Sequence, residues 1–273
     1  PERCIGCGNC VKVCAQHAKE VYDSTGEVTE LLQGGAPVVA MLAPSFPAEF
    51  VDCDYRSLSG MLRAMGFSYV CEVGFGADLV AREYQRLIRD IGGQHYIATT
   101  CPAVVSFVER YYPDLVEALA PVVSPMVAMA RTLRRLHGPD IKIVFIGPCI
   151  AKKEEAETTG EVDAVITFAE LRRLFRNHYL SPERVVPSEL DPPFAGRGAL
   201  FPLSGGLLQA AEIPENLATS EVVVADGRTG FVEALKEFYC GNWSPLLLEV
   251  LACKGCIMGP GITNSDPLFR RRS

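Results

Sequence analysis

The chain has 273 residues, of which 48% are hydrophobic and 22% charged, and its formal net charge is −7. This apolar content excludes wholesale disorder, and the length suits one large domain or two moderate lobes. The negative charge and the lack of a long Lys/Arg run argue against nucleic acid, which needs a basic face. Apolar runs are interrupted before about 18 residues, so no transmembrane helix is expected. With no secretory signal peptide found, we expect a cytoplasmic protein that does not bind membranes.

Residues 1–30 are rich in cysteine and poor in long apolar runs. The stretch CIGCGNCVKVC places Cys4, Cys7, Cys10 and Cys14 at the spacing C-x2-C-x2-C-x3-C. Bacterial ferredoxins hold a [4Fe–4S] cluster with this run, whereas zinc sites normally use two separated pairs. We therefore predict a small ferredoxin-like segment with one [4Fe–4S] cluster. Cys14 either completes this cluster or, as in two-cluster ferredoxins, serves another one.

From about residue 36, short apolar runs rich in β-branched residues alternate with longer helical patterns. The expected strands are 37–43, 69–73, 95–100, 142–147, 163–168 and 221–226. The expected helices are 77–92, 103–112, 125–137, 169–179 and 230–239. Strands that are apolar throughout are typical of sheets buried on both faces, and helical connections make such sheets mostly parallel. The sequence therefore predicts an α/β fold with twisted parallel sheets flanked by helices.

The sequence HGPD at 137–140 interrupts these elements, and we interpret it as the break between two lobes. Residues 31–273 would form the main domain, with lobes at about 31–138 and 139–250 and a cofactor in the cleft between them. The tail after residue 250 would then cross back to deliver the last two cysteines. The proline-rich stretch 181–202 is expected to be a long surface loop.

Four further cysteines are candidates for a second metal site. Cys101 and Cys149 each follow an expected strand, and Cys253 and Cys256 form a close pair near the C-terminus. Ligands of open α/β sheets gather at the carboxyl ends of strands, and four thiolates are the number that a second cubane cluster needs. A zinc ribbon would need a second close pair, which the sequence after Cys149 does not offer. A thioredoxin-type pair is expected near the front of a βαβ unit instead.

Taken together, these motifs resemble the [FeFe]-hydrogenase catalytic domain over essentially the whole chain. The family's most specific motif, Pro-Cys-x-x-Lys-x-x-Glu, is matched at 148–155. Its first motif, Thr-Ser-Cys-Cys-Pro, corresponds to TTCP at 99–102, and its third, Glu-x-Met-x-Cys with a second Cys and glycines, corresponds to 249–259. The segments APS at 43–45 and FPLSGG at 201–206 are similar to family segments that line the active site.

The resemblance implies the cofactors of the main domain. Cys101, Cys149, Cys253 and Cys256 would hold the [4Fe–4S] half of the H-cluster. One of the last pair would also bridge to a two-iron subsite that carries CO, cyanide and a dithiolate. This subsite is made by dedicated maturation proteins, so it is expected to be absent without maturation.

The resemblance also implies the residues around the two-iron subsite. The Lys152 ammonium would donate a charge-assisted hydrogen bond to a cyanide ligand, although a surface lysine is the ordinary alternative. Ser45 would donate to the other cyanide, and its alternative role is a helix cap. The residues expected to line the subsite are Ala43, Pro44, Ser45, Pro148, Lys152, Met126, Phe201 and Leu251.

The chain departs from the family pattern at several of these positions. Thr100 stands where the family has a cysteine that carries protons, and the pKa of a hydroxyl lies far above the ~8.5 of a thiol. Glu83 lies in a segment similar to one whose glutamate belongs to the proton path, although a solvated helical glutamate is the alternative. Met126 and Leu251 replace the family's Gln and Met. These changes resemble the sensory branch of the family, whose members couple this domain to signalling modules.

Two classes of function are therefore weighed. The leading hypothesis is an oxidoreductase that slowly catalyses reversible H2 oxidation and proton reduction in a sensory role, with electrons passing from the H-cluster to the N-terminal cluster. Its partners would be H2, protons, maturation proteins, and a redox partner or signalling domain on a longer chain, since this one starts without Met. The alternative is a non-catalytic hydrogenase-like iron–sulfur protein of cluster assembly or redox sensing. Retention of Lys152 and of residues 43–45 favours the enzyme.

Overall fold

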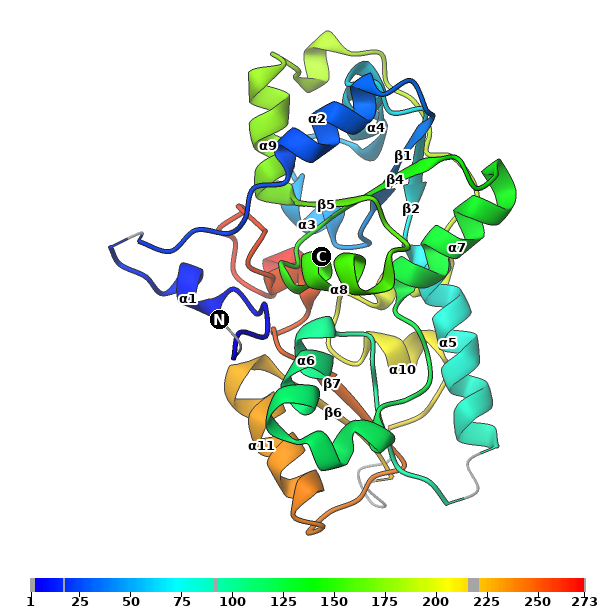
Figure 1. Ribbon diagram of the computed structural model, residues 1–273, viewed down its shortest axis with the longest axis vertical. Helices are drawn as coiled ribbons and strands as arrows, with labels where there is room; N and C mark the ends of the chain where they lie inside the picture. Colours follow the sequence, from blue (N-terminus) through cyan, green and yellow to red (C-terminus); the bar gives the residue numbers. More distant parts are fainter. Residues whose placement is uncertain (1–2, 17, 91–92, 216–220, 273) are drawn as a thin grey trace.

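The computed structural model describes residues 3–16, 18–90, 93–215 and 221–272. These residues form two separate β-sheets, both parallel throughout, with helices around them (Figure 1). The α/β fold predicted from the sequence is confirmed. Within the described ranges, no helix has both the length and the apolar character needed to span a bilayer.

The first sheet has the strand order β2-β1-β4-β5. Its strands are β1 (Val38–Leu42), β2 (Tyr69–Glu72), β4 (Lys142–Gly147) and β5 (Ala164–Thr167). The helices that pack on it are α2 (Thr25–Gln33), α4 (Tyr55–Ala64), α7 (Pro125–His137) and α9 (Phe168–Asn177). Because helices cover both faces, every residue of β1 is buried, which is why its sequence shows no polar alternation.

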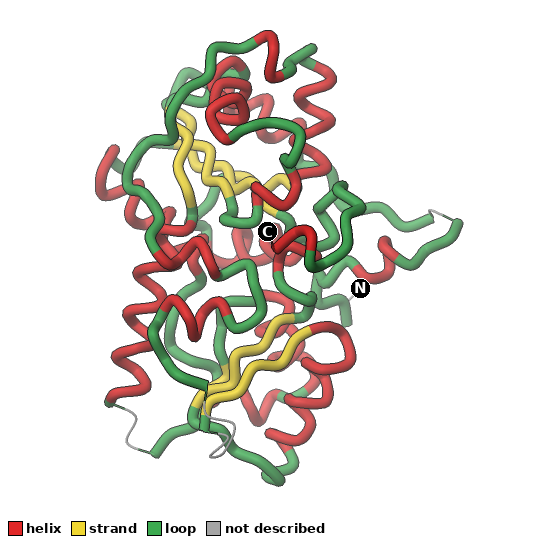
Figure 2. Tube along the Cα trace, turned by 180° about the vertical axis from the view of Figure 1, so that it is seen from behind, coloured by secondary structure: helices red, strands yellow, loops and turns green. Residues whose placement is uncertain are grey.

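The second sheet has the order β3-β7-β6, and Figure 2 shows it well separated from the first. Its strands are β3 (Tyr96–Ile97), β6 (Val222–Asp226) and β7 (Leu247–Leu251). One apolar cluster joins it to α5 (Gly74–Arg89) and α10 (Gly206–Ala210), and another to α6 (Pro102–Tyr111) and α11 (Gly227–Tyr239). The sequence did not predict β7, the central strand of this sheet.

The two lobes do not follow one another along the chain, so the predicted lobes 31–138 and 139–250 are wrong. β3 already belongs to the second sheet, and β4, directly after HGPD, returns to pair with β1. α5 leads the chain from the first sheet to the second, and α7 leads it back to the first. These two helices pack against each other. A local break cannot reveal which sheet the next strand joins, because strand pairing is a long-range contact. The division between residues 1–30 and 31–273 stays a prediction.

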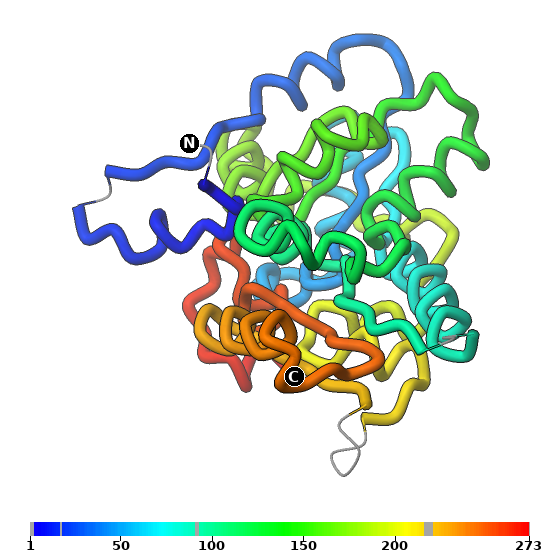
Figure 3. The backbone as a smooth tube through the Cα atoms, turned by 60° about the horizontal axis from the view of Figure 1, so that its bottom comes forward, coloured from blue at the N-terminus to red at the C-terminus, as the bar shows by residue number. Residues whose placement is uncertain are grey.

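Short helices complete the fold. They are α1 (Asn9–Lys12), α3 (Phe46–Glu49), α8 (Ala151–Thr159) and the 3-10 helices η1 (Pro113–Ala118), η2 (Pro182–Arg184), η3 (Arg197–Leu200), η4 (Cys256–Met258) and η5 (Arg270–Arg272). The stretch 181–202 has no longer element, and an ion pair of Asp191 with Arg63 ties it to α4 at 2.6 Å. Figure 3 shows the N-terminal segment beside the C-terminal tail. A Cβ added at Gly8 would lie 2.6 Å from the Pro260 side chain.

Candidate functional site

Four cysteines from both sheets surround one cavity with an empty volume of about 380 Å³. Cys101 follows β3 and precedes α6, Cys149 follows β4, and Cys253 and Cys256 follow β7. The carboxyl ends of strands from the two sheets therefore meet at this cavity, as expected for a ligand site of α/β proteins. The structure brings together the cysteines that the sequence singled out, and we refer to them as the cysteine quartet.

The environment of the quartet suits a metal cluster better than a reactive thiol. Burial raises the pKa of Cys149 to about 12, and the nearby Cys101 adds to this rise. Burial, together with the neighbouring cysteines, also raises the pKa of Cys253 and Cys256 far above the ordinary value. Iron stabilises thiolates that such surroundings otherwise keep protonated.

The cysteines stand around the cavity rather than converging on a point. Across the described ranges, no group of three or more His, Cys, Asp or Glu side chains is arranged to hold a single metal ion. Each cysteine of a cubane cluster binds a different iron atom, so its four ligands are spread around the cube.

The N-terminal cysteine run lies against the quartet. Cys7 lines the same cavity, and a Cβ added at the neighbouring Gly6 would lie 2.9 Å from the backbone of Ala151. Within the run, the Gly6 amide donates to Cys4 Sγ at 3.5 Å. Amide donors to sulfur are a feature by which proteins tune iron–sulfur clusters. This placement puts the predicted N-terminal cluster next to the quartet.

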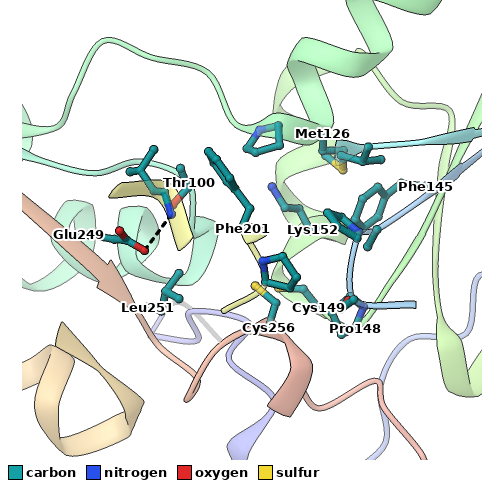
Figure 4. Close-up of a pocket in the computed structure, with 17 residues that line it drawn as sticks. Thr100, Met126, Phe145, Pro148, Cys149, Lys152, Phe201, Glu249, Leu251 and Cys256 are labelled. Atoms are coloured by element: carbon teal, nitrogen blue, oxygen red, sulfur yellow. Dashed lines mark hydrogen bonds between the residues drawn. The ribbon is translucent and has the colours of Figure 1, made fainter. Parts of the chain in front are cut away.

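A second cavity, with an empty volume of about 620 Å³, adjoins the first, and the two share Cys149 and Cys256 in their walls. Every residue that the sequence predicted around a two-iron subsite lines it. These are Ala43, Pro44, Ser45, Pro148, Lys152, Met126, Phe201 and Leu251, and Thr100 joins them. In Figure 4, Thr100 and Glu249 lie on one side of this cavity and Lys152 and Met126 on the other.

Lys152 is the cation of the second cavity. It is only 8% exposed, so the ordinary alternative of a surface lysine is wrong. Its ammonium donates to Ser124 Oγ at 2.9 Å and to Glu155 Oε2 at 2.5 Å. An ammonium has three donors, and these two contacts leave one for a group inside the cavity.

Ser45 supplies a buried hydroxyl in the wall of the same cavity. It precedes α3, but its side chain makes no capping hydrogen bond, so the helix-cap alternative is wrong. Within the described residues, Ser45 Oγ is fully buried and has no hydrogen-bond partner. A buried polar group left unpaired costs about 1–3 kcal/mol. Such groups are rare in native structures and often indicate a ligand, an ion or a catalytic role. A hydrogen-bonding ligand in the cavity would satisfy it, so the residues present fit an iron subsite with diatomic ligands.

Comparison with known families decides the identity of this arrangement. Residues 36–260 match the family model described as "Iron only hydrogenase large subunit, C-terminal domain". The chain belongs to this iron-only hydrogenase family. Residues 1–18 match the model "4Fe-4S binding domain". Iron–sulfur binding therefore belongs both to the N-terminal segment and to the hydrogenase domain, the part that carries the H-cluster in this family.

The relatives of this hydrogenase-family chain fall into two kinds. It is 27% identical to Iron hydrogenase 1 of Clostridium pasteurianum, over 76% of this chain and 45% of that protein. The NADP-reducing hydrogenase subunit HndD of Solidesulfovibrio fructosivorans is 28% identical over 94% and 55%. The cytosolic Fe-S cluster assembly factor NAR1 of Yarrowia lipolytica is 24% identical over 65% and 43%. The chain thus spans about half the length of the curated relatives it matches.

Solved structures agree on the fold. The [FeFe]-hydrogenase HydA1 of Chlamydomonas reinhardtii, in a variant form, superposes with a TM-score of 0.75 at 19% identity. The superposition covers 92% of this chain and 87% of that one. At this identity the likeness concerns the fold alone.

Glu249 is a residue of the hydrogenase-family chain whose chemical role the sequence did not reveal. It lies on β7, lines the second cavity and is 1% exposed. Burial raises its pKa to about 7, although the Leu208 and Leu207 amides donate to its carboxylate at 3.1 and 3.4 Å and oppose this rise. The signal was a lone glutamate inside the apolar run LLLEVL at 246–251, because an unpaired acid seldom occupies a buried strand.

Glu83, in contrast, was assigned to the site and lies elsewhere. It is not among the described residues that line either cavity. Its side chain is 53% exposed and its carboxylate pairs with Arg86 Nη1 at 2.6 Å. The buried face of α5 carries Val80, Ala81 and Tyr84, which turns Glu83 toward solvent. The alternative of a solvated helical glutamate is therefore the better one.

Iron content tests the two cysteine sets together. We expect protein reconstituted with iron and sulfide, without maturation, to hold two cubane clusters, or about eight iron atoms per chain. The measurement is metal analysis combined with electron paramagnetic resonance of the reduced protein. About four iron atoms per chain, or zinc in place of iron, would contradict the assignment of all eight cysteines.

Proposed function

We propose that this chain is a [FeFe]-hydrogenase domain that catalyses reversible H2 oxidation and proton reduction, slowly and in a sensory role. The observation that supports this most is the second cavity, where the Lys152 ammonium and the unpaired Ser45 hydroxyl are buried beside the cysteine quartet. A protein that held only a cubane cluster would have no use for a lysine ammonium buried at this cavity or for a buried hydroxyl without a partner, because burying charged and unpaired polar groups is costly. A two-iron subsite explains both.

When bound, the two-iron subsite supplies the metal at which H2 is split or formed. Lys152 would donate its remaining N–H to a cyanide nitrogen, and Ser45 Oγ would donate to the other cyanide. Met126, Phe201 and Leu251 are apolar and line the same cavity, so they exclude water and strengthen these hydrogen bonds. Cys256 lines both cavities, which makes it the candidate for the bridging cysteine.

Glu249 is the candidate for the proton-handling group of this cavity. A general acid or base works best when its pKa lies near the working pH, and the pKa of Glu249 is raised to about 7. Its carboxylate can therefore take up and release a proton near neutrality. The Thr100 hydroxyl on the same wall can donate and accept hydrogen bonds but does not ionise in this range.

The Thr100→Cys variant tests whether proton delivery limits the reaction. A thiol titrates much closer to neutral pH than a hydroxyl, so matured Thr100→Cys protein should turn over H2 faster than the parent. A well-placed acid–base group contributes about 10²–10⁴ in rate, and the gain will be smaller if the relay lacks other members. Thr100→Ser is the matched control and should not gain. Unchanged turnover in Thr100→Cys would mean that another step sets the rate.

Electrons would leave through the quartet cubane to the N-terminal cluster. Cys7 lines the quartet cavity, so no other element needs to carry the electron between the two clusters. A redox partner or a signalling domain would receive it, in the cytoplasm, where the NAR1 relative is named to act.

A second candidate is a non-catalytic protein of iron–sulfur cluster assembly. The observation in its favour is that an assembly factor also matches this chain, at 24% identity over 65% of it, against 27% over 76% for the Clostridium hydrogenase. An assay of H2 evolution separates the two, with reduced mediator, matured protein and unmatured protein that carries both cubanes. The proposal expects H2 only after maturation. Equal background rates from both samples would favour the assembly factor.

A further inference from the structure

Glu49 is a fully buried carboxylate that the proposed reaction does not use. It is the last residue of α3 and its side chain is 0% exposed. Arg172 on α9 pairs with it through Nε and also donates from Nη2 to the Glu49 carbonyl at 2.8 Å. Burying a charge is costly unless it is paired and fully hydrogen-bonded. The remaining contacts of this carboxylate therefore indicate what it holds in place.

Those remaining contacts go to the tail, which we define as residues 257–272. The amides of Thr263 and Asn264 donate to Glu49 Oε2 at 2.6 and 3.2 Å, and the Thr263 hydroxyl donates to Oε1. The Asn264 side chain adds a hydrogen bond to the Ala48 carbonyl at 2.8 Å. The tail begins directly after Cys256, so Glu49 fastens the chain that carries the last cluster cysteine to α3 on the first sheet.

The same short helix begins at the second cavity. Ser45 precedes α3, and the Phe50 amide at its other end donates to the Phe46 carbonyl at 2.9 Å. The Ala48 amide, next to Glu49, donates to the Ser45 carbonyl at 3.1 Å, so the two ends of this single turn are directly hydrogen-bonded. The hydroxyl of Ser45 is buried without a hydrogen-bond partner in the described structure, so its position depends on packing and on the backbone of α3.

We infer that Glu49 is a positioning residue, which holds α3 against the tail and thereby fixes the Ser45 hydroxyl relative to Cys256 across the two-iron cavity. This inference rests on the proposed two-iron site and assigns a further residue to it. The path runs from Cys256 through the tail to Glu49, and from Glu49 through α3 to Ser45. A loosened tail would misplace the donor that faces the cavity.

The test uses three variants of the whole chain. Glu49→Gln removes the charge, and Thr263→Val removes one donor from the tail side while keeping Glu49. Asp52→Asn is the matched control, because Asp52 pairs with the same Arg172 at 2.9 Å and its side chain is 60% exposed. Two readouts are taken: hydrogen exchange in cubane-loaded protein without maturation, and the cyanide infrared bands of matured protein.

We expect amides of residues 262–266 and of residues 43–46 to exchange about tenfold faster or more in Glu49→Gln and Thr263→Val, and not in Asp52→Asn. The cyanide bands should shift or broaden in the same two variants. Faster exchange of the tail alone, with residues 43–46 and the bands unchanged, would overturn the inference. If Glu49→Gln fails to fold, Thr263→Val decides. If the parent protein gains no cyanide bands on maturation, the proposed function fails, whereas the exchange of residues 43–46 still decides the role of Glu49.

Discussion

Replacing Lys152 with alanine should abolish the CO and cyanide infrared bands of matured protein while both cubane clusters stay in place. The ammonium is the one cation among the described residues that line the second cavity. Removing it deletes a charge-assisted hydrogen bond to the subsite, which is about twice as strong as a neutral one. It also takes from Glu155 its ion-pair partner, and breaking a buried ion pair costs about 3–5 kcal/mol. The bands are measured after identical maturation, at equal iron content before it.

The neighbouring Lys153 provides a control that is buried to a similar extent and also forms an ion pair. Lys153 pairs with Glu170 at 2.7 Å, and their side chains are 11% and 8% exposed, close to the 10% and 15% of Lys152 and Glu155. Lys153 does not line the second cavity in the described structure. Lys153→Ala should therefore lose similar stability and keep the bands. Equal loss of the bands in both variants would show that stability, and not the cavity contact, explains the effect.

Replacing Glu249 with glutamine should lower H2 turnover by about 10²–10⁴, the usual contribution of a general acid–base group. Glutamine keeps the shape but cannot exchange a proton. Wild-type turnover should show an inflection near pH 7, where Glu249 titrates, and this inflection should vanish in the variant. Glu83→Gln is the control, because Glu83 is exposed on α5, and its turnover should stay within twofold. A Glu249→Gln enzyme with unchanged rate and pH profile would remove Glu249 from the mechanism.

The same variant changes how stability depends on pH. Burial raises the pKa of Glu249 from 4.5 to about 7, so folding favours its protonated form. Its contribution is complete below about pH 4.5 and is lost as the pH rises through 7, by roughly 3 kcal/mol in all. Chemical denaturation at pH 5 and pH 8 should show this loss in the parent and not in Glu249→Gln. An identical pH dependence in both proteins would contradict the raised pKa.

The sequence predicted those strands whose residues form a continuous apolar run. The apolar runs that became β1 and β4 are buried along nearly their whole length, and this is the condition that makes a strand visible as a continuous run. β7 was missed because Glu249 interrupts its run, and a buried charge is not expected in a central strand. The residue that concealed the strand is thus the one with the unusual pKa. The lobe assignment failed because pairing of β4 with β1 joins distant parts of the chain.

The candidate site was predictable where a motif supplied it. The quartet and the predicted lining residues of the second cavity came from short motifs, most of them at strand ends, and the structure brings these residues together. The sequence already argued against Glu83 as a site residue. Val80, Ala81 and Tyr84 form the buried face of the same helix, and Glu83 lies outside this face. The Ser124 contact to Lys152 joins positions 28 residues apart. The link from Glu49 to Thr263 spans 214 residues. No local pattern indicates such contacts, because only the complete fold brings the partners together.

Infrared spectroscopy of matured protein separates a hydrogenase from a protein that holds only cubane clusters. Only a two-iron subsite with CO and cyanide ligands gives sharp bands in the spectral region of these triple bonds, where protein groups barely absorb. We expect such bands after maturation, absent before it, and shifted when argon is replaced by H2. Protein that keeps both cubane clusters through maturation and still shows no CO or cyanide bands would not be a hydrogenase, and the assembly factor would be favoured.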